Sequence, residues 1–372
     1  MARDVIDRQL TARPGRVQFA VATPDDDAEI RRLLRENPMP GRISISLERE
    51  PDYFADAGLP GETRQTIIAR ENSRLVCIGN CTIRERFVNG APCRVGYLGG
   101  LRLDASLAGR FDILRRGYEF FRERQADFPA DFYFTSIASD NERARWFLER
   151  GLPGMPAYEH LGDFVTLLLP TNLRPQSFKS HQPGSWEKLV TMLNQHNRRH
   201  QFAPCWSEAE LQVLHPLGLN HDDFHQIPCG AGSVCAAIWD QRIFKQTKIL
   251  GYASPLKQMR ALLNFASRLA GGIRLPDAGK ILANAFILNL TASENPAVLV
   301  PSIKALLHIA AGRGIEMLTL GLAAGDLRLP VLHQNFRVRE YHSRLYLVRW
   351  PDLGGAVREL DGRILAPEAA WL

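Results

Sequence analysis

The stretch TSIASDNERARWFLERGL, residues 135–152, joins the end of an apolar strand to a helix through Asp140 and Asn141. A side-chain oxygen at such a junction can accept hydrogen bonds from the free N–H groups of the first helical turn, so either residue suits a helix cap. Capping is one interpretation of the pair, and contact with a ligand at the strand end is another that can coexist with it. The segments on either side of this stretch bear on the choice.

The first half of the chain alternates between strand and helix patterns. A strand in VQFAVATP precedes an amphipathic helix that starts at Thr23 and Pro24, and a short helical patch is expected near LEREPDYFADAG. Three strands follow, in RQTIIAR, RLVCIGNCTIRERFV and APCRVGYLGGLRL. Apolar side chains three or four apart then predict a helix in RFDILRRGYEFFRER, which leads to the strand DFYFTSIA. This order predicts that GYLGGLRL and DFYFTSIA are parallel neighbours.

The second half repeats these patterns at an offset of about 185 residues. ILANAFILNL corresponds to YLGGLRL, IEMLTLGLAAGD to DFYFTSIASDN, and RLYLVRWP to DFVTLLLP. We therefore predict two domains, at residues 1–170 and 186–350, joined by a linker at 171–185 that is rich in Pro, Ser and polar residues. The tail, residues 351–372, has an Asp361–Gly362 turn between short apolar runs, which predicts a hairpin.

Two motifs resemble those of the GNAT superfamily, the acyl-CoA-dependent N-acetyltransferases. LDASLAGRFDILRRGY occupies the place of the family's pyrophosphate loop and following helix, and DNERARWFLERGL resembles its Asn-x-x-Ala helix. The resemblance implies an α/β (α+β) fold of two tandem GNAT-like domains, each a mixed twisted sheet flanked by helices, with a degenerate C-terminal copy. It also implies acetyl-CoA, or another acyl-CoA, as the co-substrate.

The first motif also has a physical basis of its own. A helix N-terminus presents unpaired N–H groups and the positive end of its dipole, and both attract phosphate. Gly109 lets the backbone approach closely and Arg110 adds positive charge, although an ordinary loop-to-helix turn would look the same. From the resemblance, the expected cofactor-binding residues are Leu101, Leu103, Ala108, Gly109, Arg110, Phe111, Asp112 and Asn141.

The glycine pair Gly99–Gly100 predicts a strand bulge, because glycine inside a strand often marks a bulge or a close backbone approach. In the GNAT fold this strand diverges from its parallel neighbour, and the pantetheine arm of CoA lies in the gap. A bulge that serves packing only is the alternative. Period-two alternation places Tyr97 on the strand face of Gly99 and Leu101.

The family's catalytic groups are incompletely matched. Its thiolate-protonating tyrosine would fall at Leu148, and its general-base carboxylate near Gly99. An amine must lose a proton before it attacks a thioester, and the departing thiolate must be neutralised or stabilised. Positioning alone, with a water relaying the proton, is one solution. The side chains that we consider as substitutes, each also suited to a structural role, are Tyr97, Tyr158 and Glu85.

The composition bears on whether the protein binds nucleic acid, membrane or metal. The chain of 372 residues is 45% hydrophobic and 23% charged with a net charge of +6, which is ordinary for a globular protein and modest for a nucleic-acid binder. No apolar run approaches the ~20 residues that span a bilayer. The six cysteines follow no disulfide or metal spacing, and the pairs His196/His200 and His221/His225 lack an evident third ligand. We expect a cytoplasmic protein that binds neither metal, nucleic acid nor membrane.

Together these features predict an N-acyltransferase. It would move an acetyl or other acyl group from acyl-CoA to a small-molecule amine by direct transfer in a ternary complex, since no cysteine is placed to carry the acyl group. A GNAT-like protein that binds a ligand or a partner without catalysis is the alternative, motivated by the unmatched catalytic groups. The acceptor, the acyl chain length and the formation of a homodimer are left open by the sequence.

Overall fold

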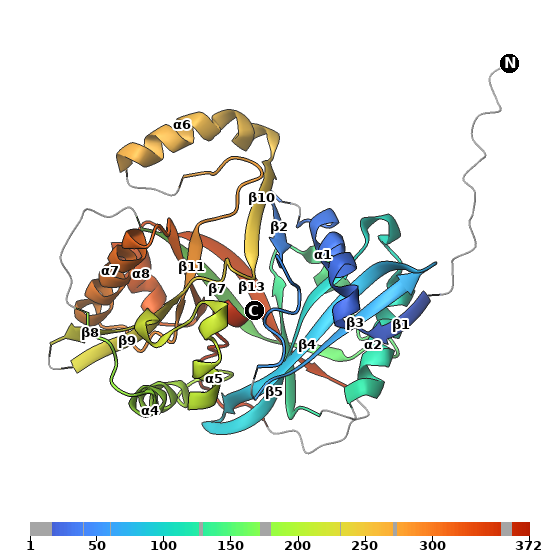
Figure 1. The fold of residues 1–372 in the computed structure, drawn as a ribbon, viewed down its shortest axis with the longest axis horizontal. Helices are drawn as coiled ribbons and strands as arrows, with labels where there is room; N and C mark the ends of the chain where they lie inside the picture. The colour runs from blue at the N-terminus through green and yellow to red at the C-terminus, as the bar shows by residue number, and fades with distance from the viewer. Residues whose placement is uncertain are drawn as a thin grey trace.

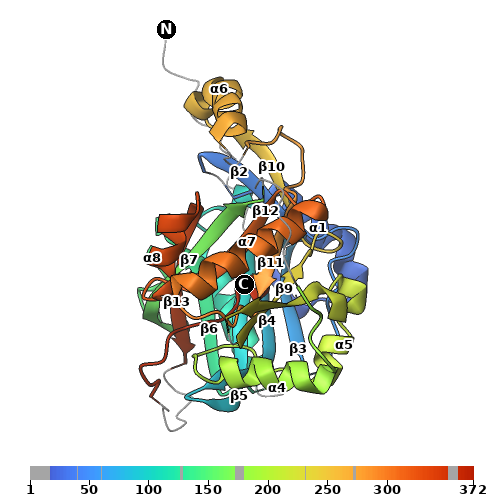
Figure 2. The same ribbon diagram turned by 90° about the vertical axis from the view of Figure 1, so that its left-hand side faces the viewer.

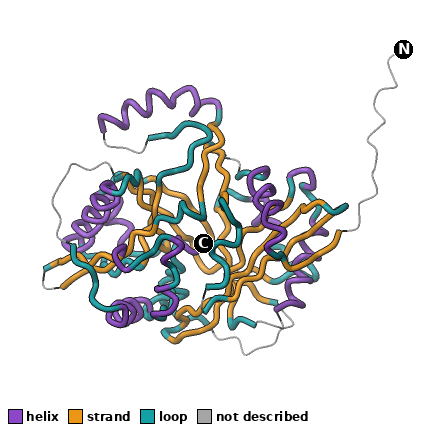
Figure 3. The backbone as a smooth tube through the Cα atoms, viewed as in Figure 1, coloured by secondary structure: helices purple, strands orange, loops and turns teal. Residues whose placement is uncertain are grey.

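The structure is a computed structural model whose described residues cover most of the chain. They are residues 17–39, 41–59, 61–125, 129–171, 180–230, 232–270, 274–350 and 359–372. Strands occupy the centre of the molecule and helices its flanks (Figure 3). Among the described residues, no helix is both long and apolar enough to cross a membrane.

The N-terminal half contains seven strands and three α-helices among its described residues. The strands are β1 (Val17–Val21), β2 (Ile43–Glu48), β3 (Thr63–Glu71), β4 (Arg74–Val88), β5 (Ala91–Leu103), β6 (Phe132–Ala138) and β7 (Ala157–Pro170). The helices are α1 (Asp27–Glu36), α2 (Phe111–Gln125) and α3 (Glu142–Leu148). The helical patch expected near residues 47–58 is wrong, because β2 and a series of turns occupy that region.

The C-terminal half contains six strands and five α-helices among its described residues. The strands are β8 (Phe224–Cys229), β9 (Gly232–Trp239), β10 (Gln246–Tyr252), β11 (Asn284–Leu288), β12 (Met317–Ala323) and β13 (Arg339–Arg349). The helices are α4 (Trp186–Asn197), α5 (Glu208–Gln212), α6 (Ser254–Ala270), α7 (Pro296–Gly312) and α8 (Arg328–Asn335). Strands β11, β12 and β13 fall on the segments that the internal repeat predicted.

One sheet runs through both halves. Its described strands have the order β1-β3-β4-β5-β6-β13-β7-β12-β11-β9-β8. The last strand of each half has crossed over: β13 lies between β6 and β7, and β7 lies between β13 and β12. Helices α1 and α2 flank one end of this sheet and α7 and α8 the other (Figures 1 and 2). The fold class predicted from the sequence, mixed sheet with flanking helices, is confirmed.

Alternating side chains bind helices to both faces of the sheet. On β3, Ile68 packs with Ile30 and Leu33 of α1, whereas Ile67 on the other face packs with Phe121 of α2. Strand β9 alternates in the same way between the clusters around α7 and α4. This period of two is what a strand buried on both faces requires. Helices α1 and α2 therefore cover opposite faces of the N-terminal end of the sheet.

The tail does not form the predicted hairpin within residues 359–372. Leu365 instead forms a bridge with Gln201, and residues Ala369–Trp371 form a single 3₁₀ turn. The Asp361 carboxylate accepts a hydrogen bond from Gln201 Nε2 at 2.7 Å, so the apparent turn residue binds a distant segment. Residues 351–358 and most of the predicted linker, 172–179, lie outside the described residues.

The crossed strands predict that residues 17–170 do not fold as an independent domain. Without the C-terminal half, β7 loses both neighbouring strands and β6 loses β13, which leaves long unpaired edges. We expect this fragment to aggregate or to unfold without cooperativity in urea, and co-expression with residues 180–372 to recover a soluble pair. A soluble monomeric fragment with a cooperative urea transition would contradict the prediction.

Candidate functional site

The predicted bulge in β5 is present. Asn80 of β4 lies opposite Gly99 and Ile78 lies opposite Arg102, so β5 carries one extra residue between these two pairs. Gly100 has φ +63°, and a Cβ there would lie 2.7 Å from Asn80 Nδ2. The conformation and the close approach both require glycine at this position. The extra residue also shifts the alternation, so that Arg102 rather than Leu101 continues the face of Tyr97 and Gly99, which corrects the predicted position of Leu101.

Strand β5 separates from its parallel neighbour directly before this bulge. Its pairing with β6 covers Val95 to Leu98 opposite Phe132 to Thr135 and goes no further among the described residues. Thr135 Oγ1 donates to the Leu98 carbonyl at 2.6 Å at the last paired position. Beyond it, β5 keeps its partner β4, and β6 keeps β13. The two strands thus leave a gap, which we call the β5–β6 opening.

A cavity of about 880 Å³ extends from this opening. Its wall includes Tyr97 and Thr82 on the α1 face of the sheet, and Leu98, Ile67 and Phe121 on the α2 face. The C-terminal half contributes residues of β10, β12, β13 and the tail. The cavity therefore touches both faces of the sheet and both halves of the chain, and its volume lies in the range of small-molecule sites.

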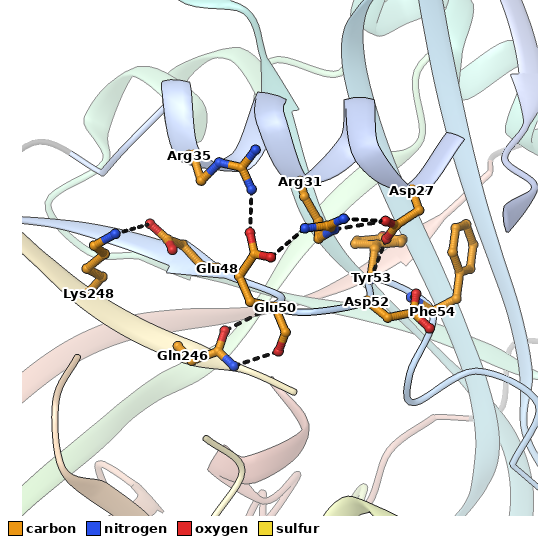
Figure 4. A network of polar contacts seen from close by, with 10 residues as sticks. All are labelled: Asp27, Arg31, Arg35, Glu48, Glu50, Asp52, Tyr53, Phe54, Gln246 and Lys248. Atoms are coloured by element: carbon orange, nitrogen blue, oxygen red, sulfur yellow. Dashed lines mark hydrogen bonds and ion pairs between the residues drawn. The ribbon is translucent and has the colours of Figure 1, made fainter. Parts of the chain in front are cut away.

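Strands β2 and β10 form a two-stranded roof over the cavity. They pair antiparallel across the two halves, and Ile43, Ile45, Thr247 and Ile249 line the wall. The Glu50 N–H donates to Gln246 Oε1 at 2.9 Å, and Gln246 Nε2 donates to the Glu50 carbonyl at 2.8 Å (Figure 4).

The roof is held to the N-terminal half by a chain of ion pairs. The Glu50 carboxylate binds Arg31 and Arg35 of α1, and Arg31 Nη2 lies 2.7 Å from the Asp27 carboxylate (Figure 4). Asp27 Oδ1 in turn accepts from the Tyr53 N–H at 2.7 Å. These contacts fix the segment after β2 in place above the cavity.

Two of the predicted catalytic candidates line the cavity. Tyr97 lies on β5, and Gly99 is required beside it because a Cβ there would lie 2.7 Å from Tyr97 Cε1. The Tyr158 hydroxyl on β7 lies 2.5 Å from that of Tyr118, next to Leu148, the position expected to lack the family tyrosine. Burial raises the pKa of both Tyr97 and Tyr158 well above the usual value, so both phenols keep their protons at neutral pH.

Glu85 is not at this cavity. Its neighbours on β4, Arg84 and Arg86, line the wall, and alternation therefore points Glu85 to the other side. Its side chain is exposed, near Cys205 on the outer surface of the sheet. Glu85 is therefore not kept as a candidate base, since its exposed side chain does not line the cavity on either face of the sheet.

The predicted diphosphate loop, around Gly109, does not line the cavity. The nearest wall residue along the chain is Ile113 of α2, just after the loop. The amides of Ala108, Arg110 and Phe111 donate to carbonyls inside the loop, at 2.8 to 3.2 Å. The Phe111 ring stacks on Phe147 with centroids 4.6 Å apart, and Leu103 packs in the core beneath α2. The expectation that these amides are unpaired and free for a phosphate is therefore wrong for Ala108, Arg110 and Phe111, because turns within the loop already use them.

Gly109 is the open position of that loop. Its φ is +102°, and a Cβ there would meet only Arg143 Nη2, at 3.8 Å. Arg110 Nε lies 2.8 Å from Asp112 Oδ1, and this hydrogen bond is the main cause that lowers the pKa of Asp112. A phosphate beside Gly109 would thus find space and the Arg143 guanidinium, whereas Arg110 is already paired with Asp112 and, at 3.3 Å, with Glu71.

Asn141 is the helix cap that the sequence suggested, and it also lies at the cavity. Its Oδ1 accepts from the Ala144 N–H at 3.2 Å and caps α3, and the residue lines the cavity together with Asp140. Leu101 also lines the cavity. The structure thus brings Leu101, Tyr97, Tyr158 and Asn141 together at one cavity.

A basic group of wall residues was not anticipated from the sequence. Lys245, directly before β10, donates to the Leu372 backbone oxygen at 3.0 Å, and the last four residues, Ala369–Leu372, line the cavity beside it. Burial, with repulsion from Arg49 and Arg64, lowers the pKa of Lys245 to about 7. Arg64, Arg84 and Arg86 lie close by on β3 and β4. No motif or spacing marks these residues, because they meet only through the sheet and the roof.

No metal-binding group of three or more His, Cys, Asp or Glu side chains is found in the described parts of the chain. His196 and His200 stack with ring centroids 4.9 Å apart, and burial lowers the pKa of both imidazoles. Burial likewise raises the pKa of Cys77 to about 12. These thiol and imidazole groups are part of the packing.

Comparison with known proteins bears on the fold of the chain. No protein-family model and no curated protein matches the sequence. Among solved structures, the chain is similar to Saccharomyces cerevisiae N-myristoyltransferase with bound myristoyl-CoA: one structure has 10% identity, a TM-score of 0.57, and coverage of 91% of this chain and 81% of that chain. A second structure of that enzyme has 10% identity, a TM-score of 0.56, and coverage of 91% and 85%.

A GCN5-related N-acetyltransferase from Anabaena variabilis also matches, with 11% identity, a TM-score of 0.46, and coverage of 89% of this chain and 72% of that chain. At such low identity, a likeness establishes the fold alone. The N-myristoyltransferase likeness spans both halves of the chain, so the N-acyltransferase fold predicted from the motifs is confirmed for the whole two-part architecture.

Proposed function

We propose that the protein transfers an acyl group from an acyl-CoA to an amine. The observation that carries the proposal is the β5–β6 opening, where two parallel strands separate at a glycine bulge and a large cavity begins. The pantetheine arm of CoA is extended and carries amide groups, so it can pair with the free edge of a strand as an added peptide strand does. The fold likeness to N-acyltransferases supports this use of the opening.

Residues around the opening would hold the acyl-CoA. Gly109 leaves room for the diphosphate, and Arg143 and Arg110 supply charge beside it. Asn141, at the cap of α3, and Leu101, behind the bulge, line the cavity where the pantetheine arm would enter. Apolar side chains beneath α2, among them Ile113 and Phe121, make a wall along which an acyl chain can lie.

The acyl-CoA supplies an activated thioester, and the protein's residues manage the protons. Lys245, with a pKa of about 7, is neutral in a large fraction of molecules at neutral pH and can take the proton of the acceptor ammonium. Tyr97 and Tyr158 keep their protons and can donate one to the sulfur as the carbon–sulfur bond breaks. Lys245 and the tail belong to the C-terminal half, which would therefore form the acceptor side of the site.

The loop assignment is tested by the opposite effects of two substitutions on CoA binding. Gly109→Glu adds bulk and negative charge where the diphosphate would lie, and should abolish measurable binding of CoA in calorimetry. Asp112→Asn removes a carboxylate that competes for Arg110 and should tighten binding about threefold to tenfold. Unchanged affinity in Gly109→Glu, with the protein folded by circular dichroism, would show that CoA does not bind at this loop.

An assay for acyl transfer distinguishes an enzyme from a protein that binds acyl-CoA without catalysis. Acyl-CoAs from acetyl to myristoyl are incubated with a panel of amines, and N-acyl products are detected by mass spectrometry. Product formation supports the transferase. Binding of acyl-CoA without any product across the panel would favour the non-catalytic alternative.

Lys245→Met tests the role of the lysine as a general base. Because Lys245 must be neutral to accept a proton, kcat should rise as pH increases through about 7. The substitution should lower kcat by about 10² to 10⁴-fold and remove that inflection. Lys248→Met is the matched control, since Lys248 lies on the same strand, pairs with Glu48 at 3.8 Å and does not line the cavity. An unchanged inflection in Lys245→Met would exclude this lysine as the base.

A further inference from the structure

Three arginines on adjacent strands form one wall of the cavity on the α1 face of the sheet. We call Arg64 of β3 and Arg84 and Arg86 of β4 the arginine wall. They are deeply buried: the Arg64 and Arg84 side chains are 5% and 12% exposed, and Arg86 is 3% exposed. Arginine is seldom buried to this extent without a matching acid, because removing a charge from water is costly.

The arginine wall has fewer acids than cations. Arg64 pairs with Asp56, which also binds Arg49 at 2.6 Å, so one carboxylate serves two guanidinium groups. Arg84 pairs with Glu62 and stacks on Trp371, with its Cζ 3.5 Å from the ring centroid.

Arg86 contacts no carboxylate among the described residues. It donates instead to the carbonyls of Phe202 and Pro367, at 2.8 and 2.9 Å. Carbonyl dipoles satisfy part of the guanidinium but do not neutralise its charge. The buried Glu368 carboxyl interacts with Arg86 without contacting it, and burial raises the pKa of Glu368 to about 7, so this acid balances the charge of Arg86 only in part.

Several donors of the arginine wall have no acceptor. The Nε atoms of Arg64, Arg84 and Arg86 and one further nitrogen of Arg64 are buried without a hydrogen-bond partner. Each of these nitrogens has less than 1 Å² of exposed surface, so an anion in the cavity would reach them only after the guanidinium groups rotate toward it. A buried donor without a partner costs free energy, and such an acceptor would restore it. The lowered pKa of Lys245 and the lowered pKa of Arg86, which is about 9, have burial as their main cause and repulsion from neighbouring arginines as the next.

From this arrangement we infer that the acceptor is an amine that also carries a carboxylate or phosphate group, and that this anion binds the arginine wall. The inference rests on the proposed acyl transfer. Tyr97 lies opposite Thr82, and Thr82 opposite Arg64, so two strand spacings, about 10 Å, separate the backbones of Tyr97 and Arg64. The amine would lie near Lys245 and Tyr97, and the anion would bind the guanidinium groups. The long arginine side chains shorten the distance between the two positions, so a small anionic amine can reach both.

Matched pairs of acceptors test the inference. Phenylalanine is compared with phenethylamine, and phosphoethanolamine with ethanolamine, so each pair differs only in the anionic group and the two pairs distinguish carboxylate from phosphate. We expect kcat/KM for the anionic member of at least one pair to exceed that of its neutral partner by roughly tenfold or more, mainly through KM. Equal values within both pairs would overturn the inference and leave the proposed transfer intact.

Substitutions assign the preference to the arginine wall. Arg64→Gln should bring the ratio of kcat/KM within each pair close to one, and Arg64→Lys should restore part of the ratio. The ratio is the readout because Arg64 also lowers the pKa of Lys245, so the substitution changes the rate with the neutral amine as well. Arg70→Gln is the control, because Arg70 lies on the same strand, pairs with Asp26 and Glu29, and does not line the cavity. Thermal unfolding checks that each variant is folded. Discrimination that survives in a folded Arg64→Gln variant would overturn the assignment.

Calorimetry separates failure of the inference from failure of the proposed function. Phenylalanine and phosphoethanolamine are titrated into the wild type and Arg64→Gln in the presence of CoA. Binding that weakens roughly tenfold in the variant supports the anionic ligand class even if no amine is acylated. A loss of CoA affinity in Arg64→Gln, with no effect on the anionic amines, would mean that the arginine wall binds the cofactor phosphates and would overturn the inference.

Discussion

The separation of β5 from β6 is the constraint on which the site depends. Two parallel strands normally satisfy each other's backbone groups along their whole length, and here they stop doing so at Leu98 and Thr135. Gly100 makes the separation possible, because its left-handed conformation and its contact with Asn80 leave no room for a side chain. The position of this opening determines where Tyr97, Leu101 and Asn141 line the cavity.

The exchange of terminal strands explains how two halves form one site. Because β13 lies between β6 and β7, and β7 pairs with β12, neither half can complete its sheet alone. The same exchange fixes β10 and the tail against the N-terminal half, where Lys245 and Trp371 meet Arg64 and Arg84. The C-terminal half thus supplies wall residues and one strand of the roof.

The sequence predicted those parts of the structure that depend on local patterns. The bulge at Gly99–Gly100, the cap at Asn141 and strands β11, β12 and β13 follow from glycine chemistry, capping and periodicity. Strand β2 was not predicted, because its partner, β10, lies about 200 residues away and leaves no local signal. Leu101 was placed on the wrong face because a one-residue bulge inverts alternation. The arginine wall and Lys245 carry no motif, so only the assembled sheet shows that they meet.

A crystal structure with bound CoA tests the central claim most directly. The account predicts that the pantetheine arm lies in the β5–β6 opening, with its amide groups within about 3.2 Å of the backbone of residues 99–102, and that the thiol faces the cavity. CoA bound elsewhere, with that opening empty or occupied by the protein's own side chains, would contradict the account.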